Sequence, residues 1–232
     1  MSTSTRLDRF LAHALNISRT DAQRFVRKER VTVHGEVVKD PSKHVTDGVA
    51  LDDEPVIAWG RVVLMMNKPA GWLSATRDPA DRTILDLVPP EHKPRDLSPV
   101  GRLDKDTTGI ILLTNDGQLN HRLTHPKRHV PRTYRVTYEG TLAPDASARC
   151  AEGLTLEDFE RLLPAELSLL EPGVCRLVLH QGVYHQVKRM IAVLGGVVTG
   201  LHREAFGPLT LGDLPQGEVR RLTPDELAAL DG

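Results

Sequence analysis

The chain has 232 residues, of which 40% are hydrophobic, and carries a formal net charge of −1. This length is typical of one or two domains with a real core. No apolar run is long enough to span a membrane, and Asp8 and Arg9 interrupt the first apolar residues, so we expect neither a membrane protein nor a signal peptide. The two isolated cysteines form neither a disulfide framework nor a zinc site, which favours a cytoplasmic location.

The net charge by itself argues against a nucleic-acid partner, because such proteins are often strongly basic. The charges are nevertheless segregated along the chain. Residues 121–135 contain five basic and no acidic side chains, whereas residues 141–171 contain seven acidic and two basic ones. A protein polarised in this way can present a basic face to a polyanion, but an ordinary solvated surface explains the pattern equally well.

The first part of the chain predicts two short helices. Thr5 with Asp8, and Ser18 with Asp21, are typical of capping pairs at their starts. The apolar stripes are Leu7, Phe10, Leu11, Ala14 and Leu15 in the first helix, and Ala22, Phe25 and Val26 in the second. The solvent side of the second helix is basic and carries Arg19, Arg24, Arg27, Lys28 and Arg30.

Short β runs follow these helices. Two of them flank His34-Gly35, where glycine allows the positive φ of a tight turn, and residues 49–51 predict another strand. We therefore expect a small helix–helix–hairpin domain over residues 1–58.

Residues 59–232 predict a second, larger domain. Buried strands are expected at 62–66 and 110–114, a two-faced strand at 133–138, another strand at 175–179, and a helix over 187–194 that ends at Gly195-Gly196. Because these elements show no regular βαβ rhythm, we expect an α+β fold, with a mixed, largely antiparallel central sheet flanked by helices.

Asp104 is a candidate reactive group. It lies in a turn-rich segment before a buried strand, between Arg102 and Lys105, and a nearby cation keeps a carboxylate ionised. Such a group can act as a nucleophile, a general base or a metal ligand, or it can simply stabilise an Asx turn; its spacing decides among none of these.

Two further sets of residues invite a functional interpretation. Lys188 and Arg189 lie near the start of a predicted helix, where the helix dipole disfavours cations, so we expect a carboxylate or phosphate partner. His121, His125 and His129 recur every four residues, as metal ligands on a helix do, but two prolines interrupt that segment. We therefore expect surface or RNA-facing histidines and no metal site.

Four motifs follow one another along the second domain. The longest, Gly101-Arg102-Leu103-Asp104-Lys105-Asp106-Thr107-Thr108-Gly109, resembles the signature of the RsuA family of pseudouridine synthases. The runs Asn67-Lys68-Pro69-Ala70-Gly71, Arg132-Thr133-Tyr134-Arg135-Val136 and Tyr184-His185-Gln186-Val187-Lys188-Arg189-Met190 resemble its other motifs. The first sixty or so residues resemble an S4-type RNA-binding module. Two positions depart from the usual pattern: Gln181 replaces a glutamate, and Arg132 replaces a lysine.

The resemblance implies roles for individual residues. Asp104 would be the catalytic aspartate, which forms an adduct with the nucleoside or drives glycal formation. Tyr134 would lie against the base as a candidate for proton transfer, and Lys188 would pair with Asp104 and keep it ionised. Arg102 would fill the space left by the flipped nucleotide. The other residues expected to bind RNA are Arg19, Arg24, Arg27, Lys28, Arg189 and Arg203. No metal or organic cofactor is implied.

The implied substrate is a uridine of 16S ribosomal RNA, of the pseudouridine 516 type, either in free RNA or in a partly assembled small ribosomal subunit. We expect the protein to act as a monomer and not to bind a membrane. Leu201-His202-Arg203-Glu204 and the short final helix both favour this small-subunit branch over a large-subunit (23S) target. A non-catalytic RNA-binding or ribosome assembly protein is the rival from another class. It predicts that Asp104, Tyr134 and Lys188 need not converge in space.

Overall fold

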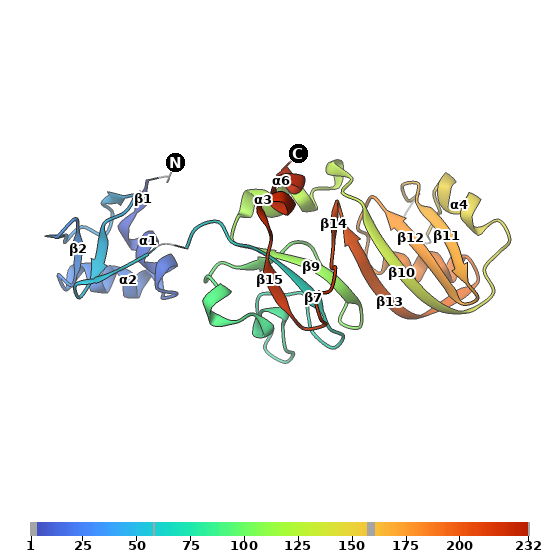
Figure 1. Cartoon of the computed structure of the whole chain (residues 1–232), viewed down its shortest axis with the longest axis horizontal. Coiled ribbons are helices and arrows are strands. Elements are labelled where there is room, and N and C mark those ends of the chain that lie inside the picture. The colour runs from blue at the N-terminus through green and yellow to red at the C-terminus, as the bar shows by residue number, and fades with distance from the viewer. Residues whose placement is uncertain (1–3, 58, 157–160, 232) are drawn as a thin grey trace. The chain divides into compact units, whose positions relative to one another are not determined.

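The computed structural model describes residues 4–57, 59–156 and 161–231, which fall into two compact units (Figure 1). The first unit comprises residues 1–62 together with 89–97, and the second comprises residues 63–88 and 98–232. This division differs slightly from the domain boundary expected after residue 58, which lies outside the described residues, and that boundary stays a prediction.

The first unit contains the helix–helix–hairpin arrangement that the sequence predicts. Its elements are β1 (Thr5–Arg6), α1 (Leu7–Ala14), α2 (Arg19–Arg27), β2 (Val31–Val33), β3 (Glu36–Val37), β4 (His44–Val45), β5 (Val49–Leu51), β6 (Glu54–Pro55) and the 3-10 turn η2 (Pro90–His92). The turn between β2 and β3 has positive φ at both His34 and Gly35, as a tight hairpin requires. The apolar stripes of α1 and α2 pack with the valines of β2 and β5 into one core.

The two expected capping pairs have different outcomes. Ser18 caps α2 as predicted, since its hydroxyl accepts a hydrogen bond from the Asp21 amide. The Thr5–Asp8 pair was a wrong prediction, because α1 begins at Leu7 and has no side-chain cap. Asp8 is instead a fully buried carboxylate that accepts hydrogen bonds from Arg6, Arg19 and Gln23. Burial opposes its ionisation, but these donors outweigh burial and hold the pKa of Asp8 well below its usual range.

The second unit has an α+β fold built on one large sheet, as the sequence predicts. Its strands are β7 (Val63–Lys68), β8 (Ser98–Pro99), β9 (Thr108–Thr114), β10 (Arg132–Gly140), β11 (Glu166–Glu171), β12 (Val174–Leu179), β13 (Gly196–Phe206), β14 (Leu209–Thr210) and β15 (Val219–Arg221). Its helices are α3 (Gly117–Thr124), α4 (Ala146–Glu152), α5 (Gln186–Val193) and α6 (Pro224–Asp231), with 3-10 turns η1 (Ile84–Leu87) and η3 (Pro126–Arg128).

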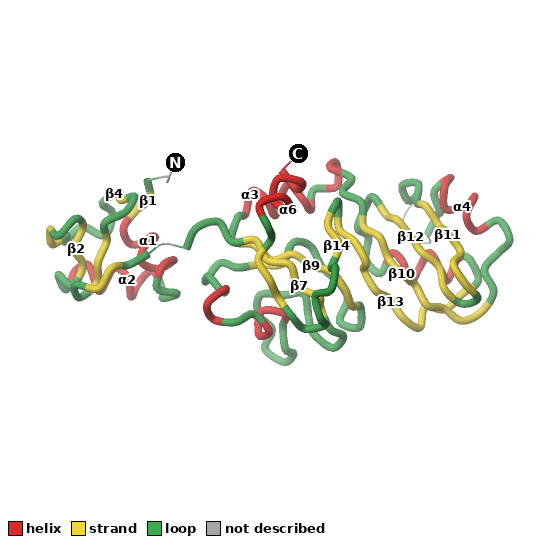
Figure 2. The backbone as a smooth tube through the Cα atoms, viewed as in Figure 1, coloured by secondary structure: helices red, strands yellow, loops and turns green. Residues whose placement is uncertain are grey.

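The main path of this sheet runs β11-β12-β10-β13-β9-β7-β15, with β8 and β14 attached to β9 and β13 (Figure 2). Its strand pairs are antiparallel among the described residues except β13 with β9, which is parallel. This one parallel pair joins the β10–β13 part of the sheet to the β7–β9 part. It therefore determines how the motifs on the two parts face each other.

Helices pack against the apolar side chains of the sheet and cover them from solvent. α3 and α6 lie together beside β9 and β15 (Figure 1), and their Leu119, Leu123 and Leu230 share a core with Met65 and Leu112. α5 ends at the predicted glycines, and Gly195 adopts a φ of +100°. None of the described helices is long and apolar enough to cross a lipid bilayer.

Gly109 explains how the parallel pair can form. It lies opposite Arg203 in the β9–β13 register with a φ of +106°. A Cβ atom at this position would lie 2.3 Å from the Arg203 carbonyl oxygen and 2.6 Å from its nitrogen. Any side chain here would push the strands apart, so the last glycine of the Gly101–Gly109 run is required by packing.

We expect Gly109→Ala to lower the free energy of unfolding by ~3 kcal/mol or more, because it combines an unfavourable φ with a backbone clash. Gly117→Ala is the matched control, since a Cβ there meets nothing within 4 Å and φ is not positive. It should be neutral or slightly stabilising. Urea denaturation measures both variants, and equal stability of the two would contradict the packing role.

Candidate active site

A buried ammonium group supports the loop that carries Asp104. Lys68, at the end of β7, has no solvent-exposed surface. Its Nζ donates to the carbonyl oxygens of Pro69 at 3.1 Å, Asp104 at 3.0 Å, Lys105 at 3.2 Å and Thr107 at 2.7 Å. One ammonium group therefore binds four carbonyl groups in and next to this turn.

Opposing effects act on this ammonium group. The pKa of Lys68 is lowered to about 8, mainly by burial; the charges of Asp106 and Asp104 oppose this shift, and the charge of Arg203 adds to it. The converging carbonyl oxygens replace the water that the cation loses on burial. Because Pro69 and three residues of the Asp104 loop all bind this one ammonium group, the conformation of the loop depends on Lys68.

Two further contacts complete the support of the loop. The Ser74 hydroxyl donates to the Leu103 carbonyl at 2.9 Å and accepts from the Leu103 amide at 3.1 Å. The Gly71 amide donates to the Lys105 carbonyl at 2.7 Å. The backbone on both sides of Asp104 is thus fixed, which is what a reactive group needs to be preorganised.

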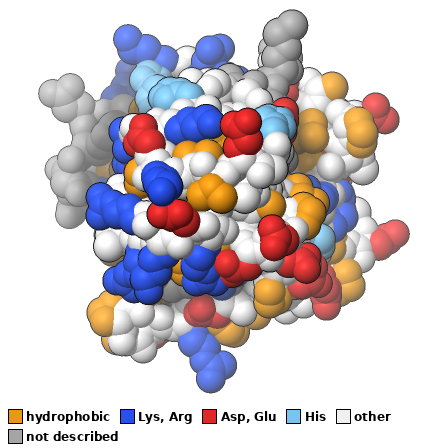
Figure 3. Space-filling model, turned by 90° about the vertical axis from the view of Figure 1, so that its left-hand side faces the viewer, with side chains coloured by type: hydrophobic (Ala, Val, Ile, Leu, Met, Phe, Trp, Pro, Cys, Tyr) orange, Lys and Arg blue, Asp and Glu red, His pale blue; other side chains and the backbone are white. Residues whose placement is uncertain are grey.

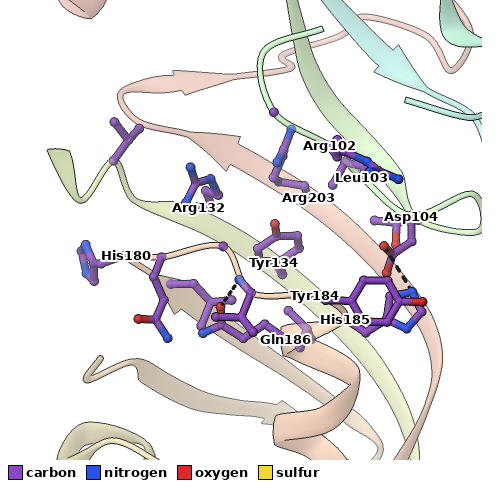
Figure 4. Close-up of a pocket in the computed structure, with 18 of the residues that line it drawn as sticks. Arg102, Leu103, Asp104, Arg132, Tyr134, His180, Tyr184, His185, Gln186 and Arg203 are labelled. Carbon is purple, nitrogen blue, oxygen red and sulfur yellow. Dashed lines mark hydrogen bonds and ion pairs between the residues drawn. The ribbon is translucent and has the colours of Figure 1, made fainter. Parts of the chain in front are cut away.

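Asp104, Tyr134 and Lys188 all line one cavity of about 430 Å³ (Figure 4). Asp104 comes from the loop before β9, Tyr134 from β10 and Lys188 from the first turn of α5. The tyrosine ring forms part of the wall and is only 8% exposed. The three predicted catalytic side chains, far apart in sequence, therefore converge.

The ion pairs around Asp104 differ from the sequence-based expectation in one respect. Lys188 Nζ lies 3.8 Å from Asp104 Oδ2 but hydrogen-bonds both oxygens of Asp106, at 2.8 and 2.7 Å. This bond is the main reason that the pKa of Asp106 is lowered. His185 Nε2 lies 3.6 Å from the other carboxylate oxygen of Asp104, Oδ1. The position of Lys188 at a helix start predicts a carboxylate partner. Lys188 has two such partners, since it bonds Asp106 and lies near Asp104.

The residues predicted to bind RNA are distributed over both units. Arg102 is exposed at the cavity, and Arg203 is a buried part of its wall (Figure 4). Arg189 lies outside the cavity lining, and one of its guanidinium nitrogens is 3.4 Å from the Tyr184 carbonyl oxygen. In the first unit, Arg19 bonds to Asp8 and Arg24 pairs with Asp21 at 3.3 Å, whereas Arg27 and Lys28 are exposed.

The residue pair Tyr184–His185 was not singled out from the sequence. The two rings stack with centroids 3.8 Å apart, and Tyr184 remains 75% exposed at the cavity. His185 holds a left-handed φ of 50° just before α5, which brings its ring to Asp104. The sequence signal that could have indicated His185 is its position directly before a predicted helix. Its positive φ, which turns the ring toward Asp104, cannot be predicted from sequence for a residue other than glycine.

The periodic histidines behave as the prolines predict. α3 ends at Thr124, so His121 belongs to the helix while His125 and His129 follow it. His125 and His129 line the cavity. The described residues contain no group of three or more His, Cys, Asp or Glu side chains arranged to hold a metal ion.

Comparisons with known proteins agree with this geometry. Residues 62–193 match the family described as RNA pseudouridylate synthase, and residues 5–51 match the S4 domain. Proteins named ribosomal small subunit pseudouridine synthase A are 43% identical in Yersinia pestis and 42% identical in Escherichia coli K12. The matches cover 97% of this chain and 97% and 99% of those proteins. A crystal structure of a pseudouridylate synthase superposes with a TM-score of 0.69 at 38% identity, covering 98% of this chain and 100% of that chain.

Replacement of Lys68 tests the support of the loop. Lys68→Met keeps the chain length but removes every donor, so we expect the free energy of unfolding to fall by ~3 kcal/mol, through buried carbonyl groups left without partners. Lys105→Met is the control in the same loop, since its exposed ion pair with Asp81 contributes ~1 kcal/mol or less. Urea denaturation gives both values, and a loss at Lys68 no larger than at Lys105 would refute the role.

Proposed function

Because the chain belongs to the RNA pseudouridylate synthase family, we propose that it isomerises a uridine of 16S ribosomal RNA in the small subunit to pseudouridine. The observation that carries the proposal is the convergence of Asp104, Tyr134 and Lys188 on one cavity. The names of the full-length relatives support the small ribosomal subunit as the source of the substrate.

The reaction breaks the bond between N1 of uracil and C1′ of the ribose and forms a bond between C5 and C1′. A proton leaves C5 and a proton is taken up at N1, so product and substrate contain the same atoms and no co-substrate is consumed. We assign the nucleophilic carboxylate to Asp104, with attack at C1′ or C6 or assistance to a glycal as the chemical routes. Lys188 Nζ and His185 Nε2 lie 3.8 and 3.6 Å from its carboxylate oxygens.

The target base has to leave its stack to reach this carboxylate, because folded RNA hides the glycosidic bond. The cavity volume of about 430 Å³ falls within the usual range for sites that enclose small ligands. Tyr134 offers a flat face and a hydroxyl group to the flipped uracil. Arg102, exposed at the cavity, is our candidate to occupy the position that the base vacates.

We assign RNA binding outside the cavity to the first unit, as an S4-type domain over residues 1–58. Figure 3 shows one face of the chain, on which many Lys and Arg side chains lie toward the left and several Asp and Glu side chains toward the lower right. Arg27 and Lys28 at the end of α2 are exposed cations suited to phosphate contacts. We further propose that the chain acts as a monomer. We expect a cytoplasmic location, where 16S RNA and partly assembled subunits are found.

The rival interpretation, a protein that only binds RNA or assists assembly, does not require a carboxylate, a tyrosine and a lysine to meet in a cavity. Their convergence therefore favours the enzyme. A large-subunit target uses the same chemistry and differs only in the RNA that is recognised, so mapping of modified positions separates the two.

The catalytic assignment predicts the behaviour of Asp104→Asn. The amide is isosteric but neutral and poorly nucleophilic, so we expect one pseudouridine of 16S RNA to disappear in cells that carry only this variant. Pseudouridine mapping of total ribosomal RNA measures it. Affinity for 16S RNA should stay within about threefold, because no phosphate-binding cation is changed.

Asp213→Asn is the control for this experiment, since Asp213 is exposed and lies outside the cavity lining. It should leave the map unchanged. A map that is the same for Asp104→Asn and for wild type refutes the proposal, and loss of a 23S site instead assigns the chain to the large subunit.

The S4-type assignment predicts that replacing Arg24, Arg27 and Lys28 together by glutamine weakens binding to 16S RNA. The slope of log Kd against log salt concentration should fall by roughly 0.7–0.9 for each phosphate that the variant no longer binds. Arg30→Gln is the control, since Arg30 is engaged with Asp52 and lies 4.7 Å from the Phe25 ring centroid. An unchanged slope in the triple variant excludes this helix as the phosphate-binding element.

A further inference from the structure

Arg203 is a buried cation that the proposed reaction does not use. The residue is 1% exposed, and its Nε donates to the Ile110 carbonyl at 2.7 Å. Its Nη2 is buried without a hydrogen-bond partner among the described residues. The side chain forms part of the cavity wall beside Tyr134, its neighbour in the β10–β13 register (Figure 4). A buried guanidinium with an unused donor is costly unless something else binds there.

A second guanidinium lies in the same part of the cavity. Arg132 lines the cavity two residues before Tyr134 on β10, and it is partly buried. The guanidinium carbons of Arg132 and Arg203 lie 5.7 and 5.3 Å from the centroid of one ring, Phe206. Burial lowers the pKa of Arg132; Tyr134 opposes this shift and the nearby charge of Arg203 adds to it. Two like charges are thus held close together at this wall.

Asp104, the one carboxylate among the described residues that line the cavity, does not neutralise this pair. Among the described residues, neither Arg132 nor Arg203 forms an ion pair with Asp or Glu. Asp104 is approached instead by Lys188 and His185. The ring of Phe206 offers only a weak electrostatic partner. Asp104 therefore has cations near it, whereas Arg132 and Arg203 have no carboxylate partner. Two cations without a counter-ion in a cavity are typical of a site that binds an anion.

We propose that Arg132 and Arg203 form a phosphate subsite, which binds a backbone phosphodiester of the RNA next to the nucleotide that enters the cavity. Arg132 makes the contact, and Arg203 supplies the second charge and a free donor from the wall. The guanidinium fork matches a phosphate better than a lysine ammonium does, since it can bond two oxygens at once. The inference rests on the proposed function, because it takes the anion to belong to the RNA substrate.

Such a subsite has a use in the proposed reaction. During isomerisation the uracil separates from the ribose and rotates, so the base no longer holds the sugar in place. A phosphate anchored at Arg132 keeps the ribose C1′ in position beside Asp104 while the base turns. This function needs an anion site at a fixed distance from the carboxylate, which the rigid strands β10 and β13 provide.

The test compares Arg132→Gln with Arg135→Gln. Arg135 lies on the same strand, but its guanidinium pairs with Glu171 at 2.6 Å, and it does not line the cavity. For Arg132→Gln we expect Kd for 16S RNA at 0.15 M salt to rise roughly 5- to 20-fold and the salt slope to fall by roughly 0.7–0.9. Arg135→Gln should match wild type, and Arg132→Lys should retain most of the slope. If Arg132→Gln stays within twofold of wild type with the same slope, the subsite is refuted.

A second measurement uses inorganic phosphate and the full-length protein. Titration followed by the nitrogen and proton resonances of arginine Nε groups should shift the Arg203 signal, identified by its loss in Arg203→Lys. The shift should vanish in Arg132→Gln. A phosphate titration that moves no signal of Arg203 overturns the proposal, and a shift that persists in Arg132→Gln overturns the role of Arg132.

Neither readout depends on the formation of pseudouridine. If Asp104→Asn leaves the modification map unchanged while Arg132→Gln loses affinity, the isomerase proposal fails and the subsite stands as an RNA-phosphate site. If the map changes as expected while Arg132→Gln binds RNA like wild type, only the subsite fails. Phosphate shifts combined with unaltered RNA affinity assign the site to a free phosphate ligand and refute the RNA contact.

Discussion

The position of the candidate nucleophile depends on one buried cation. Lys68 gathers the carbonyl groups of Pro69, Asp104, Lys105 and Thr107 around its ammonium group. Those partners span the loop that presents Asp104, so the loop is shaped around a charge instead of an apolar side chain. A hydrophobic residue of equal length would fill the space but leave the carbonyl groups unpaired. The ammonium group thus holds the turn in one geometry, which suits a carboxylate that has to meet a substrate atom.

The parallel contact of β9 with β13 brings the remaining groups to this loop. Gly109 lets β9 approach β13 at Arg203, and on the other side of β13 the antiparallel pairing with β10 places Arg203 beside Tyr134. The cavity then has two electrostatic regions. In one, Lys188 lies near Asp104 and hydrogen-bonds Asp106; in the other, Arg132 and Arg203 face the cavity without a carboxylate partner among the described residues. In our proposal, different side chains of the cavity therefore serve the reaction and the charge of the substrate.

Several local predictions from the sequence hold because they depend on neighbouring residues. The His34-Gly35 hairpin, the Ser18 cap and the end of α5 at Gly195 each follow from the conformational preferences of a few adjacent residues. Asp8 shows where this reasoning fails. Its spacing from Thr5 is that of a capping pair, but the partners that bury it, Arg19 and Gln23, come from the next helix. A long-range ion pair of this kind overrides a weak local preference.

The sequence by itself determined the fold class, four strands of the second unit and Asp104 and Lys188 as candidates, because periodicity and helix starts are properties of neighbouring residues; the resemblance of its motifs to a family added Tyr134. It did not predict β11, β13 or β15. Only the tertiary structure decided which side chains share a cavity. It brought His185 to Asp104, placed Lys188 near two aspartates, and left Arg132 and Arg203 without an ion pair to a described carboxylate. The physical reason is that electrostatic pairing depends on distances of a few ångströms between strands, and strand register, set by contacts such as Gly109 against Arg203, determines those distances.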